Sequence, residues 1–314
     1  MQHYRLNPAV VEARLTAFER NAELFTGGNF AARAVALDAV QQVYQLLQVN
    51  RSDPRWGAHL RPLKQQANAL ETRLREADGD FFQALRHRIR SGGHTAASLR
   101  QLFDDHTRYR PGRAGQIHRG YDALDALVQG LIRAEQVPEP VQALDRDMVH
   151  YEPAPARAIL DLVDQVQWTD DDVFYDLGSG LGHVAMLVHL MTGAPARGVE
   201  IDAAYSQHAR NCAEELGLPH VQFLNCDARE TDYADGTVFF MYTPFVGTVL
   251  ETVLTALANE ARSRPITVCT HGACTSDVAQ QPWLQLRHPE AAQAHALAVF
   301  NSKGFDKNNL LESP

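Results

Sequence analysis

The sequence predicts an α/β protein in which a mostly parallel sheet, flanked by helices, follows an all-helical domain. Two observations predict this fold. Residues 1–140 place apolar side chains at helical spacing, whereas from about residue 155 short apolar runs alternate with helical stretches. The change of character follows the break Val137-Pro138-Glu139-Pro140. Alternating strands and helices are typical of a parallel sheet covered on both faces. We therefore expect a helical domain over residues 1–140 and a second domain over residues 141–314.

The first half is expected to be helical throughout, because apolar residues recur every three or four positions among good helix formers. The expected helices cover 9–26, 30–49, 58–77, 80–90, 95–106 and 120–135. The Gly/Pro-rich segment Arg108–Gly115 breaks this pattern and predicts a loop. Two hypotheses stay open for this loop and the residues up to Asp122. It folds over a ligand pocket and helps to form an acceptor site, or it is a solvated connector.

The second half predicts seven strands. Short apolar runs that suit buried strands cover 173–177, 196–201, 221–225, 238–242 and 266–270. Helical stretches separate them at 182–191, 203–216 and 247–261. The runs 283–286 and 296–300 predict a terminal antiparallel pair.

Composition limits the classes of function. Of 314 residues 45% are hydrophobic and 21% charged, no apolar run reaches membrane-spanning length, and the N-terminus lacks a secretory pattern. We expect a cytoplasmic protein without a membrane partner. The net charge of −9 divides into about +3 for residues 1–150 and −12 for 151–314. An acidic second half argues against nucleic acid as a partner. The four cysteines form no CxxC pair, so no metal site is predicted.

The strongest chemical signal is the glycine-rich stretch Asp176-Leu177-Gly178-Ser179-Gly180-Leu181-Gly182, which lies between the first strand and the next helix. Glycines at such a turn let a ligand approach the backbone, and the start of the following helix offers unpaired N–H groups. Dinucleotide sites have the spacing G-x-G-x-x-G. Here the spacing is G-x-G-x-G, and His183 stands where the third glycine of a dinucleotide site belongs.

Carboxylates follow each of the first three strands of this half. Glu200 ends the second strand, where it can accept both hydroxyls of a ribose. Asp227, followed by Ala228, comes after the third strand, where it can accept a hydrogen bond from an adenine amino group. Together with Asp176 this layout predicts a site for S-adenosylmethionine (SAM), with Asp176 at its methionine end. The alternatives are solvated strand ends and the NAD site of an oxidoreductase, against which the glycine spacing and Asp227 argue.

Residues 169–182, together with Gly198-Val199-Glu200, resemble class I SAM-dependent methyltransferases. Among these the stretch is similar to the non-SET histone-lysine methyltransferases (the disruptor-of-telomeric-silencing family) and their bacterial relatives. The resemblance covers about residues 148–250. It implies a Rossmann-like sheet of seven strands in the order 3-2-1-4-5-7-6, with the last strand antiparallel. It also implies methyl transfer from SAM, with S-adenosylhomocysteine as the product.

The resemblance and the glycine turn together indicate a set of cofactor contacts. The expected contacts are Tyr151, Asp176, Gly178, Ser179, Gly180, His183, Glu200, Asp227, Ala228 and Thr243. The chain departs from the family at three places. Ala154 replaces a threonine, His183 replaces a glutamine, and Tyr242-Thr243 replaces a pair of asparagines. Those asparagines lie near the transferring methyl group and the target amine, so their loss argues against histone-type lysine chemistry.

The segment Met241–Phe245 also resembles the [DN]-P-P-[YF] loop of amino-group methyltransferases, although only Pro244 and Phe245 match it. A loop that merely closes the cofactor pocket is the alternative. An amine or phenol acceptor must lose a proton, and the candidate catalytic residues are Tyr242, Thr243 and His271. The expected acceptor is a protein side chain, lysine included, or a small molecule. A non-catalytic SAM-binding scaffold is the competing hypothesis.

Overall fold

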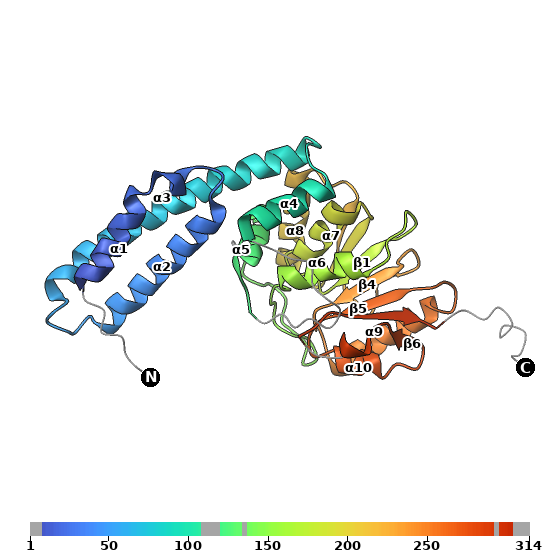
Figure 1. The fold of residues 1–314 in the computed structure, drawn as a ribbon. Coiled ribbons are helices and arrows are strands. Elements are labelled where there is room, and N and C mark those ends of the chain that lie inside the picture. The colour runs from blue at the N-terminus through green and yellow to red at the C-terminus, as the bar shows by residue number, and fades with distance from the viewer. Residues whose placement is uncertain (1–7, 108–119, 134–136, 292–294, 304–314) are drawn as a thin grey trace, which may run out of the picture. The chain divides into compact units, whose positions relative to one another are not determined.

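The computed structural model describes residues 8–107, 120–133, 137–291 and 295–303 (Figure 1). The chain forms two compact units, Met1–His87 and Arg88–Pro314. No helix among the described residues combines the length and the apolar character needed to cross a membrane. The boundary between the two units, after His87, lies before the domain boundary expected at residue 140. The expectation that the cofactor-binding part begins at residue 141 stays a prediction.

The first unit is built from long helices. They are α1 (Pro8–Arg20), the short 3-10 helix η1 (Ala22–Phe25), α2 (Phe30–Val49) and most of α3 (Gly57–Arg90). Leucine, valine and alanine side chains at helical spacing form its core, as the sequence predicts. The expectation of separate helices over 58–77 and 80–90 is wrong, because α3 is continuous. Buried Leu74 and Phe82 keep the same helical stripe across Gly79, and a single glycine costs only about 1 kcal/mol in a helix.

The second unit begins with helices that precede the sheet. They are α4 (Ala96–Thr107), α5 (Ala123–Leu131) and α6 (Ala156–Gln165). Helices α4 and α5 pack on each other and then on α7 and α6, so they belong to this unit. Asp122 caps α5 in a capping box with Asp125, which explains why α5 begins later than expected. Helix α6 was not expected from the sequence, although Ile159 and Leu162 form part of its buried face.

A seven-stranded sheet forms the centre of the second unit. Its strands are β1 (Phe174–Leu177), β2 (Ala196–Glu200), β3 (Val221–Asn225), β4 (Val238–Met241), β5 (Thr267–Thr270), β6 (Leu284–Leu286) and β7 (Ala298–Ser302). The spatial order is β3-β2-β1-β4-β5-β7-β6, and only β7 runs antiparallel to its neighbours. Both the strands and their order confirm the predicted fold class.

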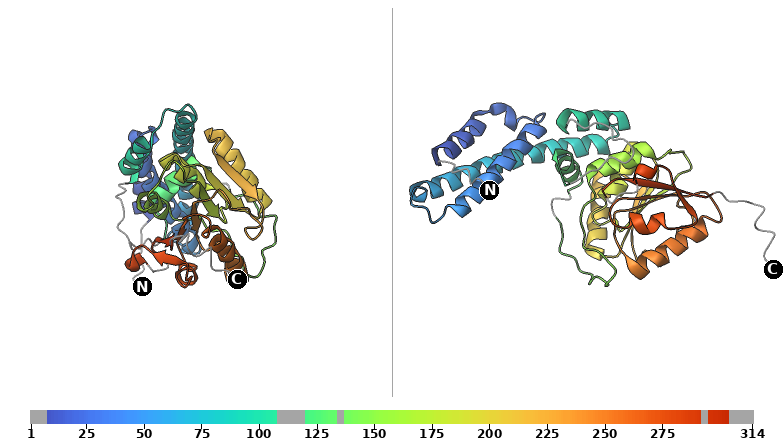
Figure 2. Two further views of the ribbon diagram at one scale, coloured as in Figure 1. Left: turned by 90° about the vertical axis from the view of Figure 1, so that its right-hand side faces the viewer. Right: turned by 60° about the horizontal axis from the view of Figure 1, so that its bottom comes forward.

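Helices cover both faces of the sheet (Figures 1 and 2). Helices α7 (His183–Thr192) and α8 (Ala203–Leu216) connect β1 to β2 and β2 to β3, and α9 (Gly247–Glu260) connects β4 to β5. Right-handed crossovers place α7 and α8 on one face and α9 on the other, because the strand order reverses direction at β1. The reversal opens a crevice at the carboxyl ends of β1 and β4, where ligands of such sheets bind.

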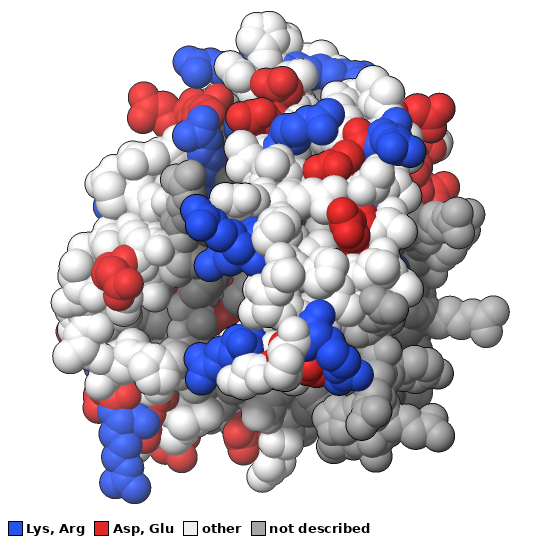
Figure 3. Space-filling model, turned by 90° about the vertical axis from the view of Figure 1, so that its left-hand side faces the viewer, with Lys and Arg blue, Asp and Glu red and all other residues white. Residues whose placement is uncertain are grey.

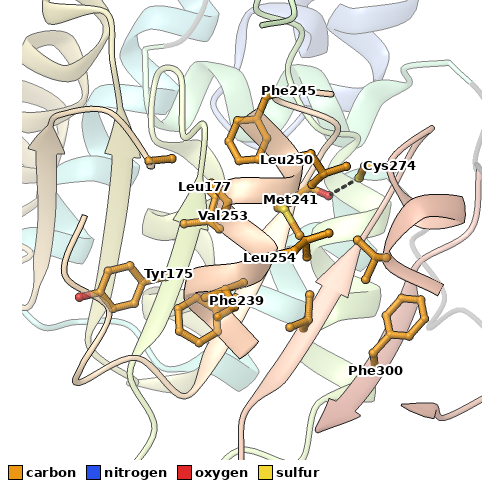
Figure 4. Packing of buried hydrophobic residues seen from close by; sticks show 14 of the residues in the cluster. Tyr175, Leu177, Phe239, Met241, Phe245, Leu250, Val253, Leu254, Cys274 and Phe300 are labelled. Carbon is orange, nitrogen blue, oxygen red and sulfur yellow. Dashed lines mark hydrogen bonds between the residues drawn. The ribbon is translucent and has the colours of Figure 1, made fainter. Parts of the chain in front are cut away.

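The face under α9 carries an extensive apolar core (Figure 4). Alternate strand residues point to this face, because side chains in a strand alternate between its two sides. The strands and α9 contribute Tyr175, Leu177, Phe239, Met241, Val253 and Leu254. The short helix α10 (Thr275–Ala279) adds Val278, and Cys274 before it lies against the carbonyl of Met241. This packing fixes the loop after β4 and the loop after β5 beside one another.

Candidate cofactor site

A cavity of about 690 Å³ lies at the carboxyl ends of the central strands. This volume is in the range of small-molecule and cofactor sites. The predicted residues that line it are Tyr151, Asp176, Gly178, Ser179, His183, Glu200, Asp227, Ala228 and Thr243. Gly180 does not line the cavity, but its N–H donates a hydrogen bond to Glu200, which does. The structure therefore brings the predicted cofactor residues together around one cavity.

The glycine turn is shaped by close packing. Gly178, Gly180 and Gly182 all have positive φ angles, which favour glycine. The N–H groups of Gly178 and Ser179 both donate to the carbonyl of Val199 at 2.9 Å. A Cβ on Gly178 would lie 2.2 Å from Cβ of Pro244. The turn is thus held against β2 on one side and against the loop after β4 on the other.

Glu200 ties the glycine turn to the end of β2. Its Oε2 accepts a hydrogen bond from the Gly180 N–H and its Oε1 from the Asp202 N–H, both at 2.8 Å. Burial raises the pKa of Glu200, and these backbone hydrogen bonds act in the opposite direction. The side chain is almost fully buried, so its remaining lone pairs are directed toward the cavity wall.

Asp176 is a buried acid that lacks a compensating cation. Its side chain is 3% exposed, and its Oδ2 has no hydrogen-bond partner among the described residues. Burial, together with the nearby charge of Glu200, raises the pKa of Asp176 to about 8. An acid in this condition strongly favours a cationic ligand, because a positive charge would offset the cost of ionising it.

His183 and Ser179 carry further unsatisfied polar atoms. Nε2 of His183 lies 3.2 Å from the carbonyl of Ala154, so it carries the proton that it donates there. Burial lowers the pKa of His183 to about 4, so the ring is neutral and its Nδ1 is an acceptor. Neither this Nδ1 nor Oγ of Ser179 has a partner in the described structure. Buried polar atoms are nearly always paired, so this wall is suited to bind the polar groups of a ligand.

Asp227 lines the cavity after β3 but is already engaged. Arg229 Nη2 donates to its Oδ2 at 2.7 Å, and the Arg229 backbone N–H donates to its Oδ1 at 2.8 Å. The hydrogen bond from Arg229 is the largest cause that lowers the pKa of Asp227. Asp227 is therefore ionised at neutral pH, and an adenine amino group would share it with Arg229.

A segment that sequence reasoning missed covers part of the cavity. Residues 140–150, here called the strap, contribute Pro140, Leu144 and Met148 to its lining. Asp202 holds one end, since its Oδ2 accepts from the N–H groups of Val141 and Gln142 at 2.7 Å each. The position of Asp202 before α8 predicts a helix cap, but nothing local in the sequence indicates the strap.

The other end of the strap is fastened to the loop after β4. Asp147 accepts hydrogen bonds from the backbone N–H and the hydroxyl of Thr248 at 2.9 and 2.7 Å. Val149 donates its N–H to the carbonyl of Pro244 at 3.1 Å. The strap therefore spans from the start of α8 to the start of α9 across the cavity.

Replacing Asp202 by Ala should loosen the strap and destabilise α8. The loss of an N-cap costs about 1 kcal/mol, and the two strap hydrogen bonds add a similar amount. Asp202→Ser separates these effects, because serine can cap α8 but is too short to hold the strap as well. Trypsin cleavage after the exposed Arg146 should be faster in both variants, whereas the free energy of unfolding should fall further in Asp202→Ala. Unchanged cleavage in both variants would show that Asp202 does not hold the strap.

The candidate catalytic residues occupy different positions. Tyr242 and Thr243 line the cavity, while His271 is 1% exposed and packs its ring edge-on against Tyr242, with ring centres 5.3 Å apart. Thr243 has a positive φ, and its hydroxyl is bound to the loop after β5, where it donates to the carbonyl of His271 and accepts from the N–H of Cys274. Tyr242 is thus the candidate whose polar group remains available to an acceptor. The catalytic roles of all three stay predictions.

The proposed lid falls partly outside the described residues. Residues 108–119 are not among those that the structure describes. Tyr121 is described, and its hydroxyl donates to Glu152 Oε1 at 2.9 Å and to the Pro153 carbonyl at 2.8 Å. Asp122 caps α5 and pairs with Arg157. Of the two residues proposed for the lid, only Tyr121 therefore contacts a residue of the cavity lining, Glu152.

Comparisons with known proteins agree with this geometry. Residues 149–258 match the family model described as histone methylation protein DOT1. An RNA methyltransferase from Salinibacter ruber, in complex with S-adenosylhomocysteine, is 23% identical with a TM-score of 0.38, over 50% of this chain and 100% of that chain. A putative methyltransferase from Escherichia coli is 16% identical with a TM-score of 0.36, over 43% and 78% of the respective chains.

A SAM-dependent methyltransferase from Thiobacillus denitrificans, also in complex with S-adenosylhomocysteine, is 21% identical with a TM-score of 0.32, over 36% of this chain and 46% of that chain. No curated protein sequence matches the chain. The family match begins at the last two residues of the strap and covers the glycine turn and the strands that carry the three carboxylates. The strand order and this match together identify the chain as a class I SAM-dependent methyltransferase with similarity to the DOT1 family.

Proposed function

We propose that the cavity holds SAM and transfers its methyl group to a basic amine on a polypeptide. The observation that supports this most is the wall formed by Asp176, Ser179 and His183, which all line one cavity and each carry a buried polar atom without a hydrogen-bond partner among the described residues. The ammonium group of SAM would donate to Asp176 Oδ2 and to Nδ1 of His183. Its positive charge would favour the ionised form of Asp176.

The other cofactor contacts follow from the strand ends. Glu200 would accept the ribose hydroxyls, and Asp227 with Ala228 would hold the adenine edge. The glycine turn lets the ligand approach the backbone, and the strap from residue 140 covers the cavity. We therefore propose that residues 141–314 are the SAM-binding part, as expected from the sequence. SAM supplies an activated methyl group, so the protein's contribution is alignment and exclusion of water.

The charge of the cavity favours a basic acceptor. Five carboxylates line it: Glu152, Asp176, Glu200, Asp202 and Asp227. The lining that the structure describes includes neither Lys nor Arg. Such a wall disfavours phosphate groups and attracts ammonium groups. On the face shown in Figure 3, basic and acidic side chains lie close to one another rather than in a continuous basic area, which also disfavours nucleic acid.

Exposed apolar side chains around the cavity favour a polypeptide over a small molecule. In the second unit, the exposed large apolar side chains that the structure describes all lie at Tyr121, on residues 137–149 or at Val246. Val141 on the strap is 70% exposed. An apolar rim beside an acidic cavity suits a peptide segment in which a basic residue lies next to apolar ones.

Calorimetry with SAM, S-adenosylhomocysteine and NAD tests the cofactor assignment. We expect the first two to bind and NAD to give no heat of binding. The double variant Asp176→Asn/Glu200→Gln should lose nearly all affinity, whereas Asp170→Asn/Glu251→Gln, which changes two exposed acids, should not. Equal affinity of the first double variant and the wild type would contradict the assignment.

Labelled SAM and an acceptor library test the transfer. Basic peptides with apolar neighbours should accept the label better than free amines or RNA. Transfer to small amines alone would favour the small-molecule alternative. Tight SAM binding without transfer to any member would favour the non-catalytic scaffold.

A further inference from the structure

Three polar side chains from distant parts of the second unit meet beside the cavity. Glu152 precedes α6, Tyr242 follows β4, and Tyr121 precedes α5. Glu152 and Tyr242 line the cavity. The Tyr121 hydroxyl donates to Glu152 Oε1 at 2.9 Å, and Tyr121 and Tyr242 lie close enough for each to affect the pKa of the other. The three groups therefore form one connected cluster, here called the acceptor cluster.

The charges around the acceptor cluster assign different roles to its members. Burial and the negative charge of Glu152 raise the pKa of both tyrosines, so both phenols stay protonated at neutral pH. Glu152 is exposed, and no Lys or Arg among the described residues forms an ion pair with it. The cluster thus combines an exposed carboxylate with two phenols that stay protonated.

Of the two residues that follow β4, one contributes its polar group to the acceptor cluster. Tyr242 and Thr243 both line the cavity. The Thr243 hydroxyl donates to the His271 carbonyl and accepts from the Cys274 N–H, both in the loop after β5, which leaves Tyr242 and Glu152 as the polar groups that an acceptor can meet.

We propose that Glu152, positioned by Tyr121, binds the cationic acceptor amine and receives its proton. This inference rests on the proposed function. The acceptor arrives as an ammonium ion, and one proton passes from its nitrogen to the Glu152 carboxylate. The neutral nitrogen then forms a bond to the methyl carbon as the carbon–sulfur bond breaks and its electron pair stays on sulfur.

Solvent takes up the proton that this step leaves on Glu152. The products are a methylated ammonium ion, S-adenosylhomocysteine and one proton on Glu152. Because Glu152 is exposed, that proton can pass to water before the next cycle. The tyrosines end the step as phenols, as they began it.

Sinefungin provides a test that needs no identified acceptor. This SAM analogue carries an amine-bearing carbon in place of the methylsulfonium, so it fixes a cation at the position of the transferring methyl group. Calorimetry should show that wild-type protein binds sinefungin more tightly than S-adenosylhomocysteine. Glu152→Gln should reduce the ratio of the two affinities about tenfold, because a hydrogen bond to a charged group is lost, while the affinity for S-adenosylhomocysteine stays unchanged. Tyr121→Phe should reduce the ratio less, about threefold.

Tyr44→Phe is the matched control. The Tyr44 hydroxyl donates to Glu71 Oε2 at 2.7 Å in the first unit, so the variant removes the same kind of tyrosine–glutamate hydrogen bond. It should change neither affinity. An unchanged ratio in Glu152→Gln and Tyr121→Phe, with S-adenosylhomocysteine still bound, would overturn this inference alone. Failure of the wild type to bind S-adenosylhomocysteine would overturn the proposed function and the inference with it.

Discussion

Asp176→Asn is expected to lower the affinity for SAM at least about 100-fold while the protein stays folded. The variant keeps the shape of the side chain but removes the negative charge that the ammonium group of SAM would meet. Removing one partner of a buried charge pair typically costs about 3–5 kcal/mol, which corresponds to a loss of more than two orders of magnitude. Calorimetry at neutral pH measures this loss directly.

The pH dependence of stability distinguishes Asp176 from an ordinary acid. Its pKa of about 8 in the folded protein compares with 3.8 for an unperturbed aspartate. Between these values the ligand-free folded protein holds a proton that the unfolded chain has released. The free energy of unfolding should therefore fall as pH rises from about 4 to about 8, and this contribution is lost once pH passes the folded pKa. Asp176→Asn should lack this decline and should be the more stable protein near pH 8 without ligand.

Binding should show the opposite trend. SAM requires the ionised form of Asp176, so binding releases a proton and tightens as pH rises toward 8. Calorimetry in buffers of different ionisation enthalpy would count that proton. Asp227→Asn serves as the comparison, because Arg229 lowers the pKa of Asp227 and it binds no proton near neutral pH. If wild type and Asp176→Asn show the same pH profiles of stability and of SAM affinity, Asp176 is not the buried acid that meets the cation.

The sequence predicts the sheet and most of the cavity because their signals are local. Each strand is a short apolar run, and the acid that follows it in the chain also follows it in space, at the same edge of a parallel sheet. The glycine turn is a continuous stretch from Asp176 to Gly182. The residues that resemble a known family lie in the same region, and this resemblance supplied the strand order. Such features need no knowledge of tertiary contacts.

Other features depend on contacts that no local pattern reports. Asp202 holds the strap across about sixty positions, and Tyr121 reaches Glu152 across thirty-one. Helix α3 shows the converse error, because the sequence predicted two helices over 58–77 and 80–90 where the structure has one continuous helix. Asp227 lies where the sequence predicts, but its pairing with Arg229 only becomes evident in the folded structure.

Gly178→Ala is expected to abolish SAM binding and to destabilise the protein by about 2–4 kcal/mol. Two costs combine. Gly178 has a φ of +77°, where a residue with a Cβ is strained by about 1 kcal/mol or more. The new Cβ would also lie 2.2 Å from Cβ of Pro244, and overpacking of this kind typically costs about 1–3 kcal/mol. Relief of the clash must move the glycine turn or the loop after β4, and both line the cavity.

Gly193→Ala isolates the first cost. Gly193 ends α7 with a φ of +80°, and a Cβ there would have no heavy atom within 4 Å. The two variants therefore share the backbone strain and differ only in the clash. Urea unfolding should show that Gly193→Ala lowers the free energy of unfolding by about 1 kcal/mol, and this variant should keep its normal SAM affinity. Gly178→Ala should lose more stability and should also lose its affinity for SAM. Equal losses in the two variants would mean that the contact with Pro244 does not constrain the turn. In that case the loop after β4 would be free to move without displacing the glycine turn.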